Sequence, residues 1–216
     1  TGAVAGCVNL PPLTAEAARE VGPWMPLMTS LGRLAARIVQ APTRLDITYA
    51  GRTDALDTRP LTRLLVASLL GAHSGRVTPV NALAEAAARG LVVAETVGGD
   101  GDGFDRLLKI RVSDGNRSRE IDATLHRGPR VVRLDGVEIE FDPQSHVLLL
   151  RNEDRPGMVG AVGSQLGALG INIVNFALGA AGDGQARAAI TVDRALDDAQ
   201  LATLRAMPGV LSLAQV

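Results

Sequence analysis

The chain has 216 residues and a formal net charge of −1, and 46% of its residues are hydrophobic while only 2% are aromatic. The near balance of 22 basic and 23 acidic residues, without a basic block beside aromatic residues, argues against a nucleic-acid-binding protein. The single cysteine excludes a disulfide framework and a zinc ribbon, and the apolar runs are too short to span a membrane. No signal-peptide pattern opens the chain, so we expect a cytoplasmic protein with aliphatic cores.

Residues 1–41 predict a short extended piece followed by two helices. Thr14 can cap the first helix, and apolar residues at spacings of three and four predict a second helix over residues 22–39. The apolar stripe of that helix, which includes Trp24 and Leu31, needs a partner surface. The chain opens on Thr1 instead of methionine, and we expect it to be part of a longer protein.

Residues 42–143 predict an α+β domain. Leu45, Ile47 and Tyr49 alternate with polar residues, which is typical of a half-buried strand. One helix should follow Thr58 and run to about residue 70, and a second helix, opened by Thr78-Pro79, should run from residue 80 to residue 89. The rest predicts strands at residues 91–97, 107–112, 119–125, 130–134 and 137–141.

Several predicted turns in this domain carry glycine, and two of them need an interpretation. Residues 98–103 match neither the dinucleotide fingerprint, because no helix follows, nor an EF-hand, because the downstream glutamate is absent. We interpret them as a hairpin turn. Asp135-Gly136 is a turn of the type that favours positive φ, and it predicts a second hairpin.

Residues 146–216 predict a ferredoxin-like βαββαβ unit, with Asp197 as the cap of its second helix. The loop over residues 151–157 follows its first strand. Pro156 is placed to be the first residue of the next helix, and Asp154 or a neighbour then falls at the helix cap. A polar loop at a helix start presents free backbone N–H groups, which can bind a carboxylate or a phosphate. We predict a small-molecule-sensing loop.

This C-terminal part resembles the ACT domain, an amino-acid-sensing module of many metabolic enzymes. The resemblance rests on Arg151-Asn152-Glu153-Asp154-Arg155-Pro156-Gly157, on Gly170-Ile171-Asn172-Ile173 and on Met207-Pro208-Gly209-Val210. Within the family, serine is held between paired ACT domains. By alignment the contacting positions are Asn152, Asp154 and Asn172, and the pairing implies a homodimer or a tetramer.

The preceding residues resemble long-form D-3-phosphoglycerate dehydrogenases. Val8-Asn9-Leu10-Pro11 and Leu31-Gly32-Arg33-Leu34 are similar to the join after the catalytic domains, and Val80-Asn81-Ala82 and Arg130-Val131-Val132-Arg133-Leu134-Asp135-Gly136 are similar to the allosteric substrate-binding, or intervening, domain. The resemblance implies a helical tail over 1–41, an intervening domain over 42–143 and an ACT domain over 146–216. It also implies a parent enzyme that oxidises 3-phosphoglycerate with NAD for serine synthesis, with its catalytic and NAD-binding residues before Thr1. We therefore expect no catalytic residue, cofactor or metal site in this chain.

Some members of that family bind phosphorylated substrate through basic residues of the intervening domain. One such position falls on Arg130. Another falls on Asp142, whose charge has the opposite sign. Apart from the resemblance, Arg130, Arg133 and His126 could together form an anion site.

Plainer interpretations stay open. Asp154 can be a helix cap without a ligand, Asn172 a turn residue, and Arg130 and Arg133 solvated charges. Cys7 is expected to be an inert thiol and His73 a loop residue. Two rival functions are the small subunit of an iron–sulfur L-serine dehydratase, whose Ser-Ser-Ser-His segment is missing here, and an interaction module that senses nothing.

Overall fold

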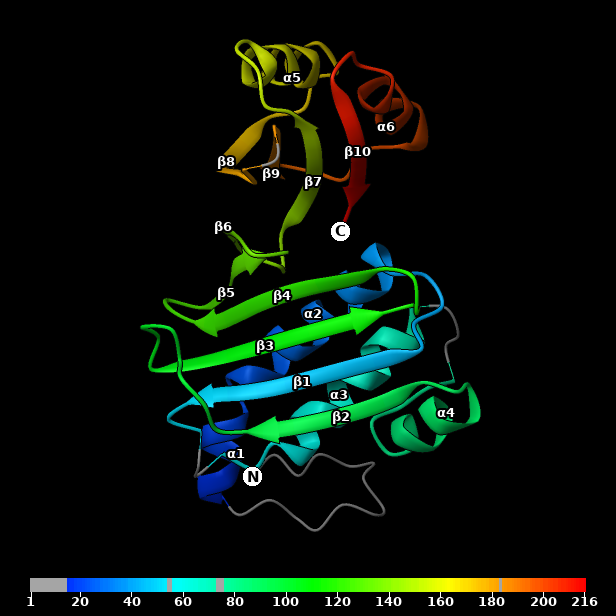
Figure 1. Ribbon diagram of the computed structural model, residues 1–216, viewed down its shortest axis with the longest axis vertical. Helices are drawn as coiled ribbons and strands as arrows, with labels where there is room; N and C mark the ends of the chain where they lie inside the picture. The colour runs from blue at the N-terminus through cyan, green and yellow to red at the C-terminus, as the bar shows by residue number, and fades with distance from the viewer. Residues whose placement is uncertain (1–14, 54–55, 73–75, 183) are drawn as a thin grey trace. The chain divides into compact units, whose positions relative to one another are not determined.

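The computed structural model describes residues 15–53, 56–72, 76–182 and 184–216. Cys7, Thr14, His73 and the 8–11 segment lie outside the described residues. The chain forms two compact units, Thr1–Ser118 and Arg119–Val216, which are described in turn. The mixed α/β architecture confirms the predicted α+β class (Figure 1).

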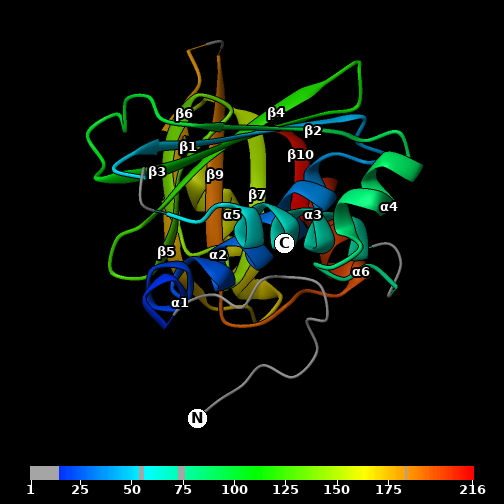
Figure 2. The ribbon, with the colours of Figure 1, turned by 90° about the horizontal axis from the view of Figure 1, so that it is seen from below.

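The first unit combines helices with three strands. Its elements are α1 (Ala15–Val21), α2 (Trp24–Ile38), β1 (Arg44–Gly51), α3 (Arg59–Gly71), α4 (Ala82–Ala88), β2 (Val92–Val97) and β3 (Arg106–Ser113). Strand β1 lies between β2, which is parallel to it, and β3, which is antiparallel. The hairpin turn predicted for residues 98–103 was therefore wrong, because this segment connects two strands on opposite sides of β1. Helices α2 and α3 cover one face of these strands (Figure 2). The buried side of β1, with Leu45, Ile47 and Tyr49, confirms the predicted alternation.

Gly32 lets α2 and α3 pack closely. A Cβ atom at this position would lie 2.5 Å from the Cβ of Ser68 and 2.6 Å from the backbone oxygen of Leu65. Since such distances are too short for any side chain, glycine sets the separation of the two helices.

The helix predicted from Thr78-Pro79 begins later than expected, at Ala82. The Oδ1 atom of Asn81 accepts hydrogen bonds from the backbone N of Thr78 at 2.7 Å and from its hydroxyl at 3.1 Å. This side-chain-closed turn satisfies the polar groups before the helix, so Pro79 lies in the turn and not at the first helical position.

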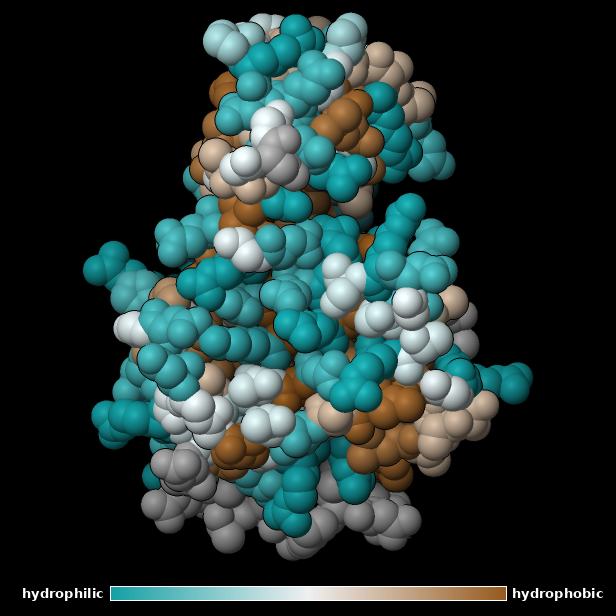
Figure 3. Space-filling model, viewed as in Figure 1, coloured by the Kyte–Doolittle hydropathy of each residue, from teal (hydrophilic) through white to brown (hydrophobic). Residues whose placement is uncertain are grey.

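Exposed apolar side chains gather over α4 and the adjoining end of β2 (Figure 3), and they include Val80, Leu83 and Val92. No described helix is long and apolar enough to cross a membrane.

The second unit contains nearly all of strand β4 (Ser118–Leu125) and all later elements: β5 (Pro129–Leu134), β6 (Val137–Phe141), β7 (His146–Glu153), α5 (Met158–Ala168), β8 (Ile173–Ala180), β9 (Gln185–Val192), α6 (Asp198–Arg205) and β10 (Val210–Gln215). The last four strands form a sheet in the order β10-β7-β9-β8, with every pair antiparallel. Two central strands that are not consecutive in sequence, β7 and β9, are typical of the ferredoxin-like fold.

Helices α5 and α6 pack on one face of this sheet. The shared core contains Leu148 and Leu150 of β7, Ile190 of β9, Leu166 of α5 and Leu204 of α6. Helix α6 is held at its start by the predicted cap: Asp197 Oδ1 accepts from the backbone N of Gln200 at 2.8 Å, and the Gln200 side chain accepts from the backbone N of Asp197 at 3.0 Å. The predicted capping pattern therefore placed the start of α6 correctly.

Candidate effector-binding site

The loop that follows β7 does not start the helix where the sequence predicted. Helix α5 begins at Met158, and its cap position is Gly157 with φ +90°, without a side-chain capping bond. Pro156 is therefore not the first helical residue, and Asp154 is not the cap. A glycine in the left-handed region interrupts the helical backbone, so residues 154–157 form a turn, in which the backbone N of Arg155 donates to Glu153 O at 3.1 Å.

Three segments meet at this loop. The backbone N of Glu153 donates to Gly209 O, and the backbone N of Asp154 donates to Gly184 O, both at 2.9 Å. The Arg155 guanidinium donates from Nη2 to Pro208 O at 3.1 Å and lies 3.1 Å from a Glu153 carboxylate oxygen. The loop is thus held to the end of the β8–β9 turn and to the turn before β10.

Asn152 and Asp154 lie on this loop or next to it, in different surroundings. Asn152 is only 4% exposed, and its Nδ2 donates to Glu153 O at 2.7 Å, which shapes the backbone where the strand ends. Asp154 is exposed, and its carboxylate has no hydrogen-bond or ion-pair partner among the described residues. An anionic group without such a partner is available to a cationic ligand.

Asn172 lies elsewhere. Its backbone N donates to Asp193 Oδ1 at 3.1 Å, and its carbonyl accepts from the backbone N of Asp193. It precedes Ile173, which is paired with Val192, whereas Asn152 is paired with Ala186 on the same strand β9. At about 3.4 Å per residue along a strand, roughly 20 Å separate these two ends of the sheet. One chain therefore does not bring Asn172 together with Asn152 and Asp154.

Strand β8 is an edge strand. It is bonded to β9 on one side and has no partner strand on the other among the described residues. Two apolar side chains of this edge, Val174 and Leu178, are 64% and 50% exposed. An apolar edge strand with unpaired backbone groups is suited to pairing with another strand.

The two arginines predicted for an anion site are both on β5, and each is already held by carboxylates. Arg130 lies 3.4 Å from an oxygen of Asp142 and 3.5 Å from an oxygen of Glu140. Arg133 is bonded to Asp122 at 2.6 Å. An added anion would compete with these acids, and Asp142, the position of opposite sign, is one of them.

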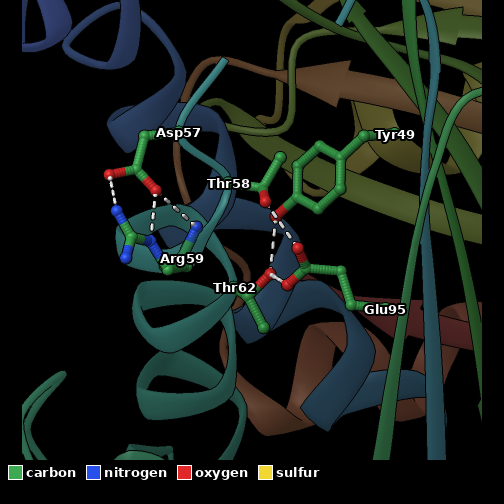
Figure 4. A network of polar contacts seen from close by, with 6 residues as sticks. All are labelled: Tyr49, Asp57, Thr58, Arg59, Thr62 and Glu95. Atoms are coloured by element: carbon green, nitrogen blue, oxygen red, sulfur yellow. Dashed lines mark hydrogen bonds and ion pairs between the residues drawn. The ribbon is translucent and has the colours of Figure 1, made fainter. Parts of the chain in front are cut away.

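Sequence reasoning missed a polar network in the first unit (Figure 4). Thr58, the residue before α3, and Thr62 of α3 donate to the two oxygens of Glu95 on β2 at 2.5 Å each. Because the hydroxyl hydrogen of Thr62 is used in this way, the Tyr49 hydroxyl donates to Thr62, at 2.9 Å. Burial, together with the nearby Glu95 charge, raises the pKa of Tyr49 above its ordinary value. Two threonines four residues apart, one just before α3 and one in its first turn, are the signal that could have indicated it.

The comparisons with known proteins match two successive parts of the chain to two families. Residues 20–135 match the family described as the D-3-phosphoglycerate dehydrogenase intervening domain, and residues 146–207 match the ACT domain. The chain belongs to this dehydrogenase family. Its intervening and ACT domains correspond to the C-terminal regulatory region of these enzymes.

Several D-3-phosphoglycerate dehydrogenases are similar over most of the chain. The Bacillus subtilis enzyme is 27% identical over 215 residues, which are 97% of this chain and 41% of that protein. The Synechocystis enzyme is 29% identical over 94% of this chain and 38% of its own length. The Mycobacterium leprae enzyme is 33% identical over 71% of this chain and 30% of its own length. This chain thus spans about two fifths, or less, of the curated relatives it matches.

Proposed function

We propose that this regulatory region of a D-3-phosphoglycerate dehydrogenase serves L-serine biosynthesis and binds L-serine between two ACT domains. The observation that carries the proposal is the separation of Asn172 from Asp154 within one chain. A site that uses both residues needs a second copy. The parent would be an NAD-dependent oxidoreductase of the cytoplasm, with its NAD-binding and catalytic residues in the part of its relatives that this chain does not span.

Pairing through strand β8 supplies that second copy. In an antiparallel pair of β8 strands related by a two-fold axis, the Ile173 end of one copy lies beside the Ala180 end of the other. Ala180 is paired with Ala186, and Ala186 with Asn152, so this is the end that carries the loop. The bond from Asp154 N to Gly184 O keeps the loop close to the end of the β8–β9 turn, toward the partner. Pairing two such dimers would give a tetramer.

The side chains suit a small amino acid. The exposed Asp154 carboxylate can accept hydrogen bonds from an α-ammonium group, and the Asn172 amide of the other copy can bind a hydroxyl or a carboxylate. The Asn152 side chain donates a hydrogen bond to Glu153 O and so fixes the backbone at the start of the loop. We therefore assign Asn152 as a positioning residue of the site. A ligand that binds the paired state better than the separated state shifts the equilibrium toward pairing, and in this way it can regulate a remote active site.

The test uses two variants. Asp154→Asn changes the residue that one copy contributes to the site, and Asn172→Ala removes the amide that the other copy contributes. Asp198→Asn is the control at an exposed acidic residue. We expect calorimetry to show L-serine binding to the wild type and the control, and at least tenfold weaker binding to each variant alone. When the two variants are mixed, each mixed pair contains one site with both substitutions and one intact site. Binding to the mixture should therefore return for part of the chains.

A mixture that stays as weak as its components would mean that the site lies within one chain. Absence of any heat with wild-type protein at millimolar L-serine would favour the interaction module that senses nothing. The dehydratase alternative is not supported by the family match, which is to the intervening domain of the dehydrogenase.

A further inference from the structure

The hairpin formed by β5 and β6 belongs to two groupings at once. The match to the intervening domain ends at residue 135, so it includes all of β4 and β5. The compact second unit nevertheless begins at Arg119 and joins β4, β5 and β6 with the ACT strands. An element assigned by sequence to one domain is thus packed with the next.

The packing is closest at Gly179 of β8. A Cβ atom there would lie 2.3 Å from Val137 Cγ1 and 2.7 Å from the backbone oxygen of Glu138, both on β6. Figure 1 shows β6 beside β8. A side-chain rotation could move the valine methyl group but not the backbone oxygen, so only glycine permits this distance between the hairpin and the ACT sheet.

A charged contact lies next to this glycine. Arg187 of β9 is paired with Gly179, and its Nε atom is 3.9 Å from the Asp135 carboxylate in the β5–β6 turn. The same carboxylate accepts from Arg119 Nε at 2.8 Å and from the backbone N of Glu120 at 3.0 Å. Asp135 itself has φ +50°, as the predicted Asp-Gly turn requires. One carboxylate therefore ties β4, the hairpin turn and the ACT strand β9 together.

We propose that the β5–β6 hairpin is the relay element of this protein: it is held by the ACT sheet at Gly179 and Arg187, and it transmits the state of strand β8 to β4, the strand of the intervening-domain match that pairs with β5. Strand β8 contacts the hairpin through Gly179, and its outer edge is the one that pairs with a second copy. Pairing or ligand binding at that edge fixes β8 and therefore fixes the hairpin. The part of this proposal that concerns a ligand rests on the proposed function, whereas the packing of β6 against Gly179 does not.

Amide hydrogen exchange over residues 129–141 tests the relay. Gly179→Ala should raise exchange in this segment about tenfold or more, while residues 146–153 of β7 keep their protection. Gly160→Ala is the matched control, because nothing lies within 4 Å of a Cβ atom at that position. Arg187→Gln is a milder variant, which keeps the test available if Gly179→Ala fails to fold, and it should raise exchange of the hairpin severalfold.

L-Serine should slow exchange of residues 129–141 severalfold in the wild type, and in Gly179→Ala it should still bind but no longer slow it. Unchanged exchange of the hairpin in both Gly179→Ala and Arg187→Gln would overturn the proposal, and so would serine binding to the wild type without any change in this segment. If serine does not bind at all, the proposed function fails. In that case amide exchange of residues 129–141 is measured at high and low protein concentration. Pairing alone should slow exchange of the hairpin at high concentration. If the sample pairs and exchange of the hairpin does not depend on concentration, the relay proposal is overturned.

Discussion

Asp154 and Asn172 lie at opposite ends of the ACT sheet of one chain, although both belong to the motifs that resemble a single amino-acid site. The proposed edge-to-edge pairing of β8 would resolve this separation, since an antiparallel pair brings opposite ends together. The outer edge of β8 should therefore be required for pairing.

The double substitution Val174→Asp with Leu178→Asp should prevent pairing, because it places carboxylates where two copies meet. Both side chains are exposed in the single chain, so the variant should keep its fold by circular dichroism. In sedimentation we expect the wild type to be a dimer or larger and the double variant to be a monomer. Leu211→Asp on β10, the opposite edge of the sheet, is the control and should not change the oligomeric state. A double variant that still pairs would contradict the role of β8.

Gly209→Ala should lower the free energy of unfolding by about 1–2 kcal/mol. Gly209 has φ +87°, and a Cβ atom there would lie 3.0 Å from both Arg155 Nη2 and Met158 Sδ. Because Gly209 O also accepts from the backbone N of Glu153, L-serine affinity should fall in parallel. Gly160→Ala in helix α5 should instead leave stability unchanged or raise it by up to about 1 kcal/mol. Urea denaturation of the two variants gives the comparison, and equal effects would contradict it.

Tyr49 should keep its proton at a pH where ordinary tyrosines have lost theirs, since burial raises its pKa above the usual value of 10.0. The protonated Tyr49 side chain stabilises the fold. This contribution to the free energy of unfolding is complete below pH 10, and it is lost as the pH rises from there toward the pKa of Tyr49 in the folded state. The chain contains one tyrosine, so tyrosinate absorbance reports this group alone. We expect no tyrosinate absorbance from the folded protein at about pH 10.5, whereas the protein unfolded in urea should show the titration of an ordinary tyrosine. In Tyr49→Phe the alkaline loss of stability should be smaller, and at pH 7 the lost bond to Thr62 should cost about 1 kcal/mol.

Asp57 should stabilise the fold at neutral pH but not in acid. Arg59 donates to its carboxylate from Nε at 2.8 Å and from Nη2 at 2.9 Å, and this pair lowers the pKa of Asp57. The contribution is present above the unfolded-state pKa of about 4 and is lost as the pH falls through the lower folded-state pKa. Because the Arg59 side chain is 70% exposed, Asp57→Asn should cost only about 0.5 kcal/mol at pH 7.

Denaturation at pH 7 and near pH 2 measures the difference for this pair. Asp105→Asn, which removes an exposed pair with Arg52 at 3.4 Å, is the control and should have no measurable effect at either pH. A cost for Asp57→Asn that persists in acid would show that the ion pair is not its cause.

Local patterns in the sequence predicted most of the fold. The Asp135-Gly136 turn, the Asp197 cap and the alternation along β1 all depend on neighbouring residues, and the structure confirms each of them. The start of α5 was predicted wrongly, because Pro156 and Gly157 give conflicting local signals and glycine, in the left-handed region, decides the backbone.

The candidate site was less accessible to sequence reasoning. Alignment named Asp154 and Asn172 but could not show that one chain keeps them apart, since strand register determines their separation. The Glu95 network and the Gly179 contact join residues far apart in sequence and leave only weak local traces. The contact of the two arginines with acids arises in the same way, from pairing of β5 with β4 and β6.

The contact between Gly179 and Val137 also bears on how this protein can be dissected. A fragment cut at the linker near residue 144 would begin at the first ACT strand and lose the hairpin that covers β8 at Gly179. The face so uncovered would be available for association with other molecules and would add to the pairing measured at the β8 edge. A fragment that begins at Arg119 keeps the whole compact unit, so the hairpin still covers β8 at Gly179 in it.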